Sequence, residues 1–334
     1  MLVHLRLTVP AALTDDVLDL LADDDRTANL TRCRGASISP EGDLVECDVA
    51  RELAGEVIGR LKELGLHQSG GIVVTTPTST PFAAARRLGE IAPGDPDDAV
   101  IWDMVVEQCW AASRPTISYL LFFVLATLLA AIAVITDSAV LVIGAMVVGP
   151  EFGTVAAIAA GLVLRRPRLA RRAVAVLVGG IVVSVTVVAV LSLVGGLTGL
   201  VTQDMVTRAR PQTGFIWHPD RWSFIVALIA GAAGVLALTT SRANAMVGVF
   251  ISVTTIPAVG NLALALGLGA PSEIRGSAAQ LAVNLGGMVL AGVLVLVLQR
   301  LLWVPTLAAS QRLFNRREMD RRRARDDDPA QPTR

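Results

Sequence analysis

Six long apolar segments after Pro115 constrain this chain more than any other feature of its sequence. They cover residues 117–135, 138–164, 173–200, 223–240, 244–268 and 277–303. Each approaches or exceeds the roughly 20 residues that an α-helix needs to cross the hydrocarbon core of a bilayer. Only 17% of the residues are charged, against about 25% in soluble domains. The sequence therefore predicts an integral membrane protein with six transmembrane helices.

Clusters of arginine indicate which loops face the cytoplasm. They comprise Arg165, Arg166, Arg168, Arg171 and Arg172 after the second segment, and Arg312, Arg316, Arg317, Arg321–Arg323 and Arg325 after the sixth. Because cytoplasmic loops are enriched in Arg and Lys, both termini are predicted to be cytoplasmic, with Asp137, residues 201–220 and residues 270–276 outside. The N-terminus lacks the basic segment and apolar core of a signal peptide. We expect a multi-pass protein of the cell membrane.

Residues 1–76 have the pattern of a soluble α+β domain. Strands are predicted at 2–9, 30–38, 44–49 and 71–75, and helices at 11–24 and 51–64, where Gly65 ends the second helix. The order β-α-β-β-α-β is that of a ferredoxin-like sandwich. Ligand sensors, metal carriers and oligomerisation modules share this fold, so it does not define a function. With no cluster of metal ligands, we favour an oligomerisation or regulatory role over small-molecule catalysis.

Two further regions flank the predicted membrane domain, residues 115–305. Residues 77–114 begin with a linker rich in Thr, Pro, Ala and Asp and end with an amphipathic helix. That helix either lies at the membrane surface or packs on the soluble domain. Residues 306–334 form a basic cytoplasmic tail.

Cofactor and nucleic-acid chemistry find no support in the sequence. Cys33, Cys47 and Cys109 lack the spacing of a disulfide framework or a zinc site. A formal net charge of zero gives no argument for nucleic acid. There is no HExxH, no GxSxG and no pair of Asp residues at membrane depth, so an intramembrane enzyme is the least supported class.

The membrane region contains an internal repeat with an offset of 107 residues. At this offset Pro150 aligns with Pro257, Gly153 with Gly260, and Gly179-Gly180 with Gly286-Gly287; Asp137 pairs with Asn244, and Arg168 with Arg275. The two units span about 117–200 and 223–303. Because each has three spans, the second must enter the membrane inverted. Inverted repeats of this kind are typical of secondary transporters.

The second helix of each unit is predicted to be interrupted near its middle, at 148–153 and at 254–261. Proline removes a backbone donor and glycine relaxes the local geometry, which frees polar backbone groups at bilayer depth. Paired discontinuous helices indicate a transport site; the alternative is a pair of proline kinks satisfied by Ser and Thr side chains. The residues predicted to line a substrate or ion path are Gly149, Pro150, Glu151, Gly153, Thr154, Thr254, Thr255, Pro257, Gly260, Asn261 and Asn284.

Glu151 is an acid in the middle of an apolar segment. A charge at this depth is costly, so its side chain is predicted to point inward, toward the break around Pro257. Following Pro150, it is either an acid that caps the first turn of a half-helix or a site for a cation or proton.

The stretch Asp137–Met146 (DSAVLVIGAM), followed by Gly149, Pro150 and Gly153, resembles the signature of a bacterial and archaeal family called the uncharacterised hydrophobic domain, or domain of unknown function 389. Residues 227–234 (ALIAGAAG) and 248–257 (GVFISVTTIP) are similar to motifs in its second half. Members pair a small N-terminal domain with such a membrane region. The family pattern has Ser-Pro-Leu-Met-Gly-Pro where this chain has Gly-Pro-Glu-Phe-Gly-Thr at 149–154, and two prolines where this chain has Pro257-Ala258, so Glu151 is not a family motif residue.

The family name implies no activity, so the functional hypothesis depends on the repeat and its interrupted helices. We expect a transporter or channel for a small solute or ion in the lipid bilayer, assembled as a homo-oligomer. The alternative is a scaffold or sensor that does not transport, in which the soluble domain acts and the helices anchor it.

Overall fold

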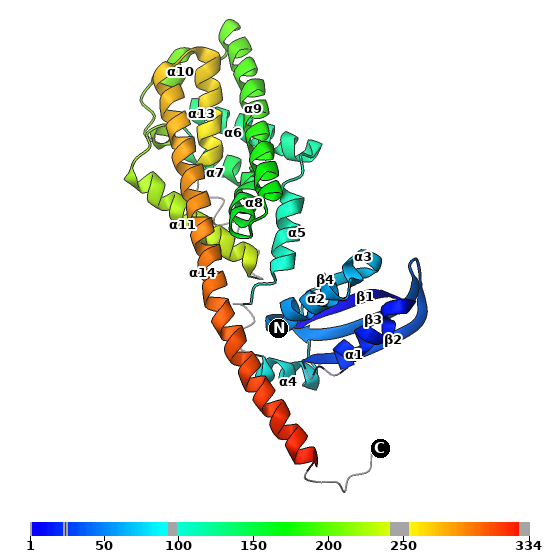
Figure 1. The fold of residues 1–334 in the computed structure, drawn as a ribbon. Helices are drawn as coiled ribbons and strands as arrows, with labels where there is room; N and C mark the ends of the chain where they lie inside the picture. Colours follow the sequence, from blue (N-terminus) through cyan, green and yellow to red (C-terminus); the bar gives the residue numbers. More distant parts are fainter. Residues whose placement is uncertain (1, 23, 25, 93–98, 241–253, 327–334) are drawn as a thin grey trace. The chain divides into compact units, whose positions relative to one another are not determined.

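The computed structural model describes residues 2–22, 24, 26–92, 99–240 and 254–326, with side chains described as far as Leu302 except at Ile91. The chain divides into two compact units, Met1–Asp103 with Gln299–Arg334 and Met104–Leu298 (Figure 1). The first unit contains the β-sheet, and the second contains the apolar helices.

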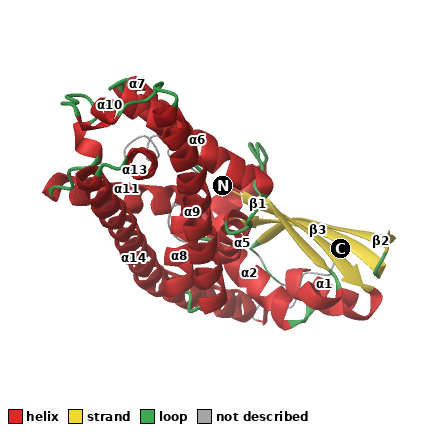
Figure 2. Cartoon of the chain, turned by 90° about the horizontal axis from the view of Figure 1, so that it is seen from above, coloured by secondary structure: helices red, strands yellow, loops and turns green. Residues whose placement is uncertain are grey.

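The sheet of the first unit has four antiparallel strands in the order β2-β3-β1-β4. Figure 2 draws the strands in yellow. The strands are β1 (Leu2–Pro10), β2 (Thr27–Ile38), β3 (Glu41–Ala50) and β4 (Gly71–Thr75). In β1 the alternating residues Leu5 and Leu7 are fully buried opposite Cys47 and Val45 of β3. Successive side chains of a strand point to opposite faces. The predicted alternation is therefore confirmed, with one apolar face to the sheet.

Two helices pack against this sheet, α1 (Thr14–Ala22) and α2 (Arg51–Glu63). In α2, Leu53, Val57 and Leu61 are buried. The helix ends before Gly65, whose positive φ of 79° suits a residue without a side chain. The short helices of this unit are η1 (Ala11–Leu13), α3 (Leu66–Ser69) and α4 (Ala83–Ile91). Helix α4 lies inside the stretch whose composition indicates a linker.

The second unit is helical throughout. Its helices are α5 (Trp102–Ala112), α6 (Ile117–Ile135), α7 (Ala139–Val148), α8 (Glu151–Val163), α9 (Pro167–Leu197), α10 (Gln203–Thr207), η3 (Gly214–Ile216), α11 (Arg221–Thr239), α13 (Thr255–Leu268) and α14 (Pro271–Asp326), of which α5 begins and α14 ends in the first unit. Four of them, α6, α9, α11 and α14, are long and apolar enough to cross a membrane. The bent pair α7 and α8 makes a fifth candidate span.

These helices match the predicted apolar segments only in part. The predicted segment 244–268 begins outside the described residues, and its described part is the 14-residue helix α13. Large apolar side chains on the long helices are exposed in the isolated chain, such as Leu121, Val182 and Leu294 at 56–58%. Exposed apolar surface of this extent is compatible with a membrane protein.

Helix α13 lies at the centre of this unit. Its residues Ala258, Ala263 and Leu264 pack in one apolar cluster with side chains of α6, α7 and α9. It also approaches α6 closely, because a side chain at Gly260 would contact Ala130 and the backbone of Thr127. A short apolar helix that contacts three other helices is positioned by packing.

Helix α5, predicted to be amphipathic, is tied to the start of α9. The guanidinium of Arg172 lies 5.7 Å from the ring centroid of Trp110, and its Nε donates a hydrogen bond to the carbonyl of Ser113 at 3.0 Å. The C-terminal end of α5 therefore packs against the apolar helices.

Candidate functional site

The first interrupted helix breaks where the sequence places Pro150. Helix α7 ends at Val148, Gly149 is extended, and α8 begins at Glu151, with a bend of 53° between the two helices. Proline lacks a backbone N–H, clashes with the carbonyl four residues back and favours an extended residue before it. Gly149 and Pro150 therefore account for the predicted break.

Most of the residues at which the second break was predicted, 254–261, lie inside a helix. Helix α13 runs without interruption from Thr255, so Pro257 and Gly260 lie inside its first two turns. Proline is tolerated there because the first N–H groups of a helix have no partner within the helix. The residues before Thr254 lie outside the described part of the chain. Pro257 thus marks the beginning of a helix, and the expected interruption at 254–261 is corrected accordingly.

The N-terminal ends of α8 and α13 meet. A Cβ atom added to Gly149 would lie 2.5 Å from Cγ1 of Ile256 and would also collide with Oε2 of Glu151. Both atoms therefore occupy the space beside Gly149, and the carboxyl group of Glu151 lies next to Ile256, in the predicted direction. Only glycine leaves enough room for this contact.

The surroundings of Glu151 are largely apolar. The residue is 7% exposed, and its Oε2 has no hydrogen-bond partner among the described residues. Thr154 Oγ1 donates to the backbone carbonyl of Glu151 at 2.6 Å, so this hydroxyl does not donate to the carboxyl group of Glu151. Buried carboxylates normally require paired charges, hydrogen bonds or water. Glu151 is the first residue of α8, whose positive N-terminal end favours a carboxylate, so a capping role and a cation or proton role both fit this geometry.

A group of hydrogen-bonded side chains connects the start of α13 to α14. Thr254 Oγ1 accepts hydrogen bonds from Asn284 Nδ2 at 2.9 Å and from Gln280 Nε2 at 3.1 Å. Gln280 Oε1 and the hydroxyl of Thr255 are buried and have no partner in the described part of the chain. Polar atoms that can still form hydrogen bonds are thus present beside the N-terminus of α13.

A buried ion pair lies one to two turns further along α13. Arg210 Nη2 donates to Glu273 Oε2 at 2.6 Å, and Arg210 Nη1 donates to Asn261 Oδ1 at 3.0 Å. The Nδ2 of Asn261 in turn donates to Glu273 Oε2 and to Ser277 Oγ, both at 2.8 Å. The Arg210 and Glu273 side chains are only 1% and 2% exposed. This network joins the segment between α10 and η3 to α13 and α14.

Close packing at glycine holds these helices together. The ring of Phe152 fills the space beside Gly234 of α11, and a Cβ at Gly153 would lie 3.0 Å from Ala112 Cβ. On the other side, Gly260 rests on Ala130 of α6. Helix α8 therefore packs on α11, and α13 packs on α6.

The predicted path residues separate into four groups. Gly149, Pro150, Glu151, Thr255 and Pro257 surround the meeting point of α8 and α13, with Thr154 in the first turn of α8. Thr254 and Asn284 belong to the polar group beside it, and Asn261 belongs to the ion-pair network. Gly153 and Gly260 serve as packing positions.

Sequence reasoning missed Arg210, Glu273, Ser277 and Gln280. A signal was present for three of them, because Glu273, Ser277, Gln280 and Asn284 recur at intervals of four, three and four residues. Such spacing places polar side chains on one face of a helix. Arg210 had no comparable signal, since it lies in a segment predicted to be an outer loop.

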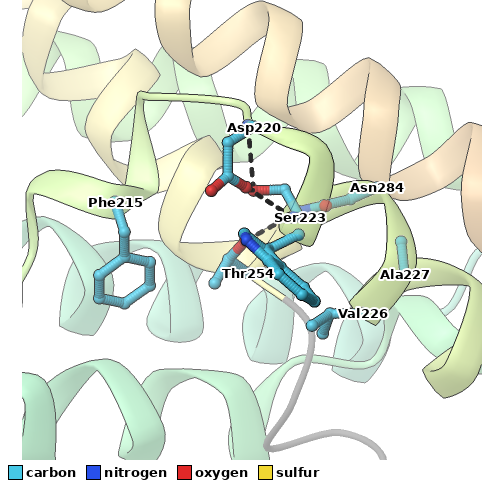
Figure 3. Close-up of a pocket in the computed structure, with 8 residues that line it drawn as sticks. Phe215, Asp220, Ser223, Val226, Ala227, Thr254 and Asn284 are labelled. Carbon is cyan, nitrogen blue, oxygen red and sulfur yellow. Dashed lines mark hydrogen bonds between the residues drawn. The ribbon is translucent and has the colours of Figure 1, made fainter.

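A cavity of about 280 Å³ opens beside Thr254 and Asn284 (Figure 3). Its other lining residues are Phe215, Asp220, Trp222, Ser223, Val226 and Ala227. The cavity therefore lies between the first turns of α11 and the polar group of α13 and α14.

Comparison with known proteins identifies the region that contains these features. Residues 146–290 match the family described as "Domain of unknown function (DUF389)". An uncharacterized protein of Methanocaldococcus jannaschii, MJ0678, is 24% identical over 214 residues, which are 64% of this chain. The chain spans 63% of the length of that relative. No solved structure matches this chain. The resemblance seen in the sequence is confirmed over residues 146–290.

Proposed function

We propose that this protein is an integral membrane transporter or channel for a small solute or ion, with its path between the N-terminal ends of α8 and α13. The observation that carries the proposal is the contact between Gly149 and Ile256, which brings the two ends together around the buried carboxyl group of Glu151. Buried polar atoms of Glu151, Thr255 and Gln280 have no partner among the described residues. Unpaired polar groups at this depth are tolerated where they line a cavity or bind a ligand.

The bend between α7 and α8 favours a span over a re-entrant loop. A re-entrant loop must nearly reverse the chain direction, whereas these two helices bend by 53°. At 1.5 Å per residue, their 10 and 13 residues give a combined length of about 35 Å, enough for a hydrocarbon core of about 30 Å.

Contacts at the offset of 107 residues support an inverted repeat of three plus three spans. Gly180 of α9 packs against Phe123 of α6, and Gly287 of α14 packs against Phe224 and Ala227 of α11. The contacts of α8 with α11 and of α13 with α6 are also equivalent at this offset. In this arrangement, α8 packs on α11, the first helix of the second unit, and α13 packs on α6, the first helix of the first unit.

The N-terminal unit is assigned to oligomerisation or regulation. Read from the other edge, its strand order β4-β1-β3-β2, with α1 and α2 packed against it, supports a ferredoxin-like arrangement. We place this unit and both termini in the cytoplasm, and we assign no catalytic step to the protein.

The scaffold or sensor alternative has one observation in its favour. The network of Arg210, Asn261 and Glu273 is closely hydrogen-bonded and buried, which is what a rigid anchor requires. In that case the helices would bind the bilayer and one another without passing a solute.

The experiment is a screen of solute and ion flux with the purified protein in liposomes. Glu151→Gln is compared with wild type and with Glu107→Gln, which removes an exposed acid of α5. If Glu151 handles a cation or proton, Glu151→Gln abolishes the ion or pH dependence of the flux while oligomeric size stays the same. If Glu151 only caps α8, the variant loses thermal stability but keeps its flux. Wild-type protein that oligomerises but passes no solute or ion rejects transport in favour of the scaffold.

A further inference from the structure

The cavity beside α11 combines one acidic residue with two aromatic residues. Phe215 precedes α11, Asp220 is the N-cap of that helix, and Trp222 lies in its first turn. Figure 3 shows the side chain of Thr254 between Phe215 and the first turns of α11, with Asp220 above it. No Arg, Lys or His side chain is among the residues that line it. Asp220 therefore carries the one formal charge of the lining, and that charge is negative.

Local hydrogen bonds keep the carboxylate of Asp220 in place and ionised. The backbone N–H and the hydroxyl of Ser223 donate to Asp220 Oδ1 at 2.7 and 2.9 Å. The backbone hydrogen bond from Ser223 holds the pKa of Asp220 below its usual value. Asp220 forms no ion pair with any described cationic side chain, so its charge remains available to a ligand.

Two other polar residues of the lining, Thr254 and Asn284, are neutral. The hydroxyl oxygen of Thr254 accepts hydrogen bonds from the amides of Gln280 and Asn284. These bonds fix the orientation of Thr254 and Asn284, two uncharged side chains that line the cavity. Such groups can accept or donate a hydrogen bond to a ligand without adding charge.

We propose that this cavity binds a small organic ammonium ion. A carboxylate attracts any cation, but aromatic faces favour a large, weakly hydrated one, as in the recognition of quaternary ammonium groups. A volume of about 280 Å³ suits a ligand of few heavy atoms. The proposal that the ion binds depends on the cavity alone. Transport of this ion as the substrate would be a further step, and that step rests on the proposed function.

The first test measures equilibrium binding of radiolabelled choline to the purified full-length protein in detergent. The competitor is 3,3-dimethylbutan-1-ol, which has the shape of choline without its charge. We expect saturable choline binding that the neutral alcohol does not displace. Equal competition by the alcohol, or no saturable binding up to about 10 mM choline, overturns the proposal.

The second test uses variants that separate charge from folding. Asp220→Asn removes the charge but keeps an N-cap residue of equal preference, so α11 is retained. We expect at least roughly tenfold weaker choline binding for Asp220→Asn, while Asp204→Asn, an exposed acid of α10 outside the cavity, binds like wild type. Equal effects of the two variants overturn the proposal.

A third comparison tests the aromatic wall. Trp222→Leu should weaken choline binding by roughly tenfold, and Trp222→Phe should restore most of it, because a ring is kept. Choline binding that Trp222→Leu leaves unchanged contradicts the inference. Choline binding without any flux in liposomes supports the cavity and rejects transport, whereas flux of other solutes without choline binding rejects only the cavity.

Discussion

Arg210 and Glu273 are 63 positions apart in the chain, yet their side chains meet at 2.6 Å with almost no exposure to solvent. Arg210 precedes η3, and Glu273 lies in the first turn of α14. Asn261 of α13 bonds to both side chains and completes the link. This network fixes the middle of α13 relative to two other segments.

Breaking this ion pair is predicted to destabilise the protein strongly. Glu273→Gln leaves Arg210 buried without a countercharge, which costs about 3–5 kcal/mol of unfolding free energy. The double variant Arg210→Met with Glu273→Leu should recover much of that loss, because a buried pair can be replaced by apolar side chains of similar size. Thermal unfolding in detergent measures both, with Arg221→Met, an exposed arginine, as control. A Glu273→Gln variant as stable as the control contradicts the prediction.

The contact at Gly149 is predicted to be essential for the path. Its backbone has φ −66° and ψ 131°, which any residue can adopt, so Gly149→Ala tests space alone. The added methyl group would collide with Ile256 and the Glu151 carboxyl, and overpacking of this kind costs about 1–3 kcal/mol. We expect lower stability and loss of flux in liposomes. The control is Gly144→Ala, whose added methyl group would make an ordinary 3.5 Å contact with Leu129. This variant should keep the stability and the flux of the wild type.

The two Gly-Gly pairs provide a test of the repeat. A Cβ at Gly180 would lie 3.0 Å from atoms of Tyr119 and Phe123, and one at Gly287 would lie 2.9 Å from Ala227 Cβ. Nothing lies within 4 Å of a Cβ at Gly179 or Gly286. Alanine at the first glycine of each pair should therefore raise the unfolding temperature, since helix propensity gains about 1 kcal/mol. Alanine at the second glycine should lower it. The opposite order in either pair would contradict equivalent packing in the two units.

Cysteine labelling can establish the orientation in the membrane. Cys33 is exposed in the N-terminal unit, whereas burial raises the pKa values of Cys47 and Cys109 to about 12 and keeps these thiols unreactive at neutral pH. An impermeant maleimide should therefore label Cys33 only after the membrane is opened. It should label Ser272→Cys, an exposed position of α14, in intact cells. Labelling of Ser272→Cys only in inverted vesicles would reverse the proposed topology.

Acid is predicted to weaken the β2–β3 hairpin through Asp43. The backbone N–H of Gly35 and the guanidinium of Arg32 bind its carboxylate at 2.8 and 2.6 Å, and the backbone hydrogen bond is the main cause of its lowered pKa. The stability from these bonds is present above the unfolded-state pKa of about 3.9 and is lost as the pH falls through the lower folded-state pKa. Asp43→Asn should make the stability of the hairpin less dependent on pH. Unfolding at each pH is measured by the reaction of Cys47 with a disulfide reagent that remains active in acid. An unchanged pH profile in Asp43→Asn would exclude Asp43 as the cause.

Local patterns in the sequence predicted the local elements well. The alternation from Leu2 to Val9 became β1, Gly65 ends α2, and Pro150 separates α7 from α8. In each case the cause acts within a few residues, through strand periodicity, a positive φ or a missing N–H. The family resemblance belongs to this level too, because it depends on short runs of residues such as 137–153.

The sequence by itself thus determined the apolar helices, the strands and the break at Pro150. Tertiary structure decided which polar groups meet. Helix α13 begins at Thr255, so Pro257 lies inside its first turn, and Asn261 bonds to Arg210 and Glu273 across 51 and 12 positions. Packing of α13 among longer helices fixes these pairs, because a buried charge or amide must find its partner wherever the fold places one. Periodicity, which reports only which residues share a face, carries no information about such a partner.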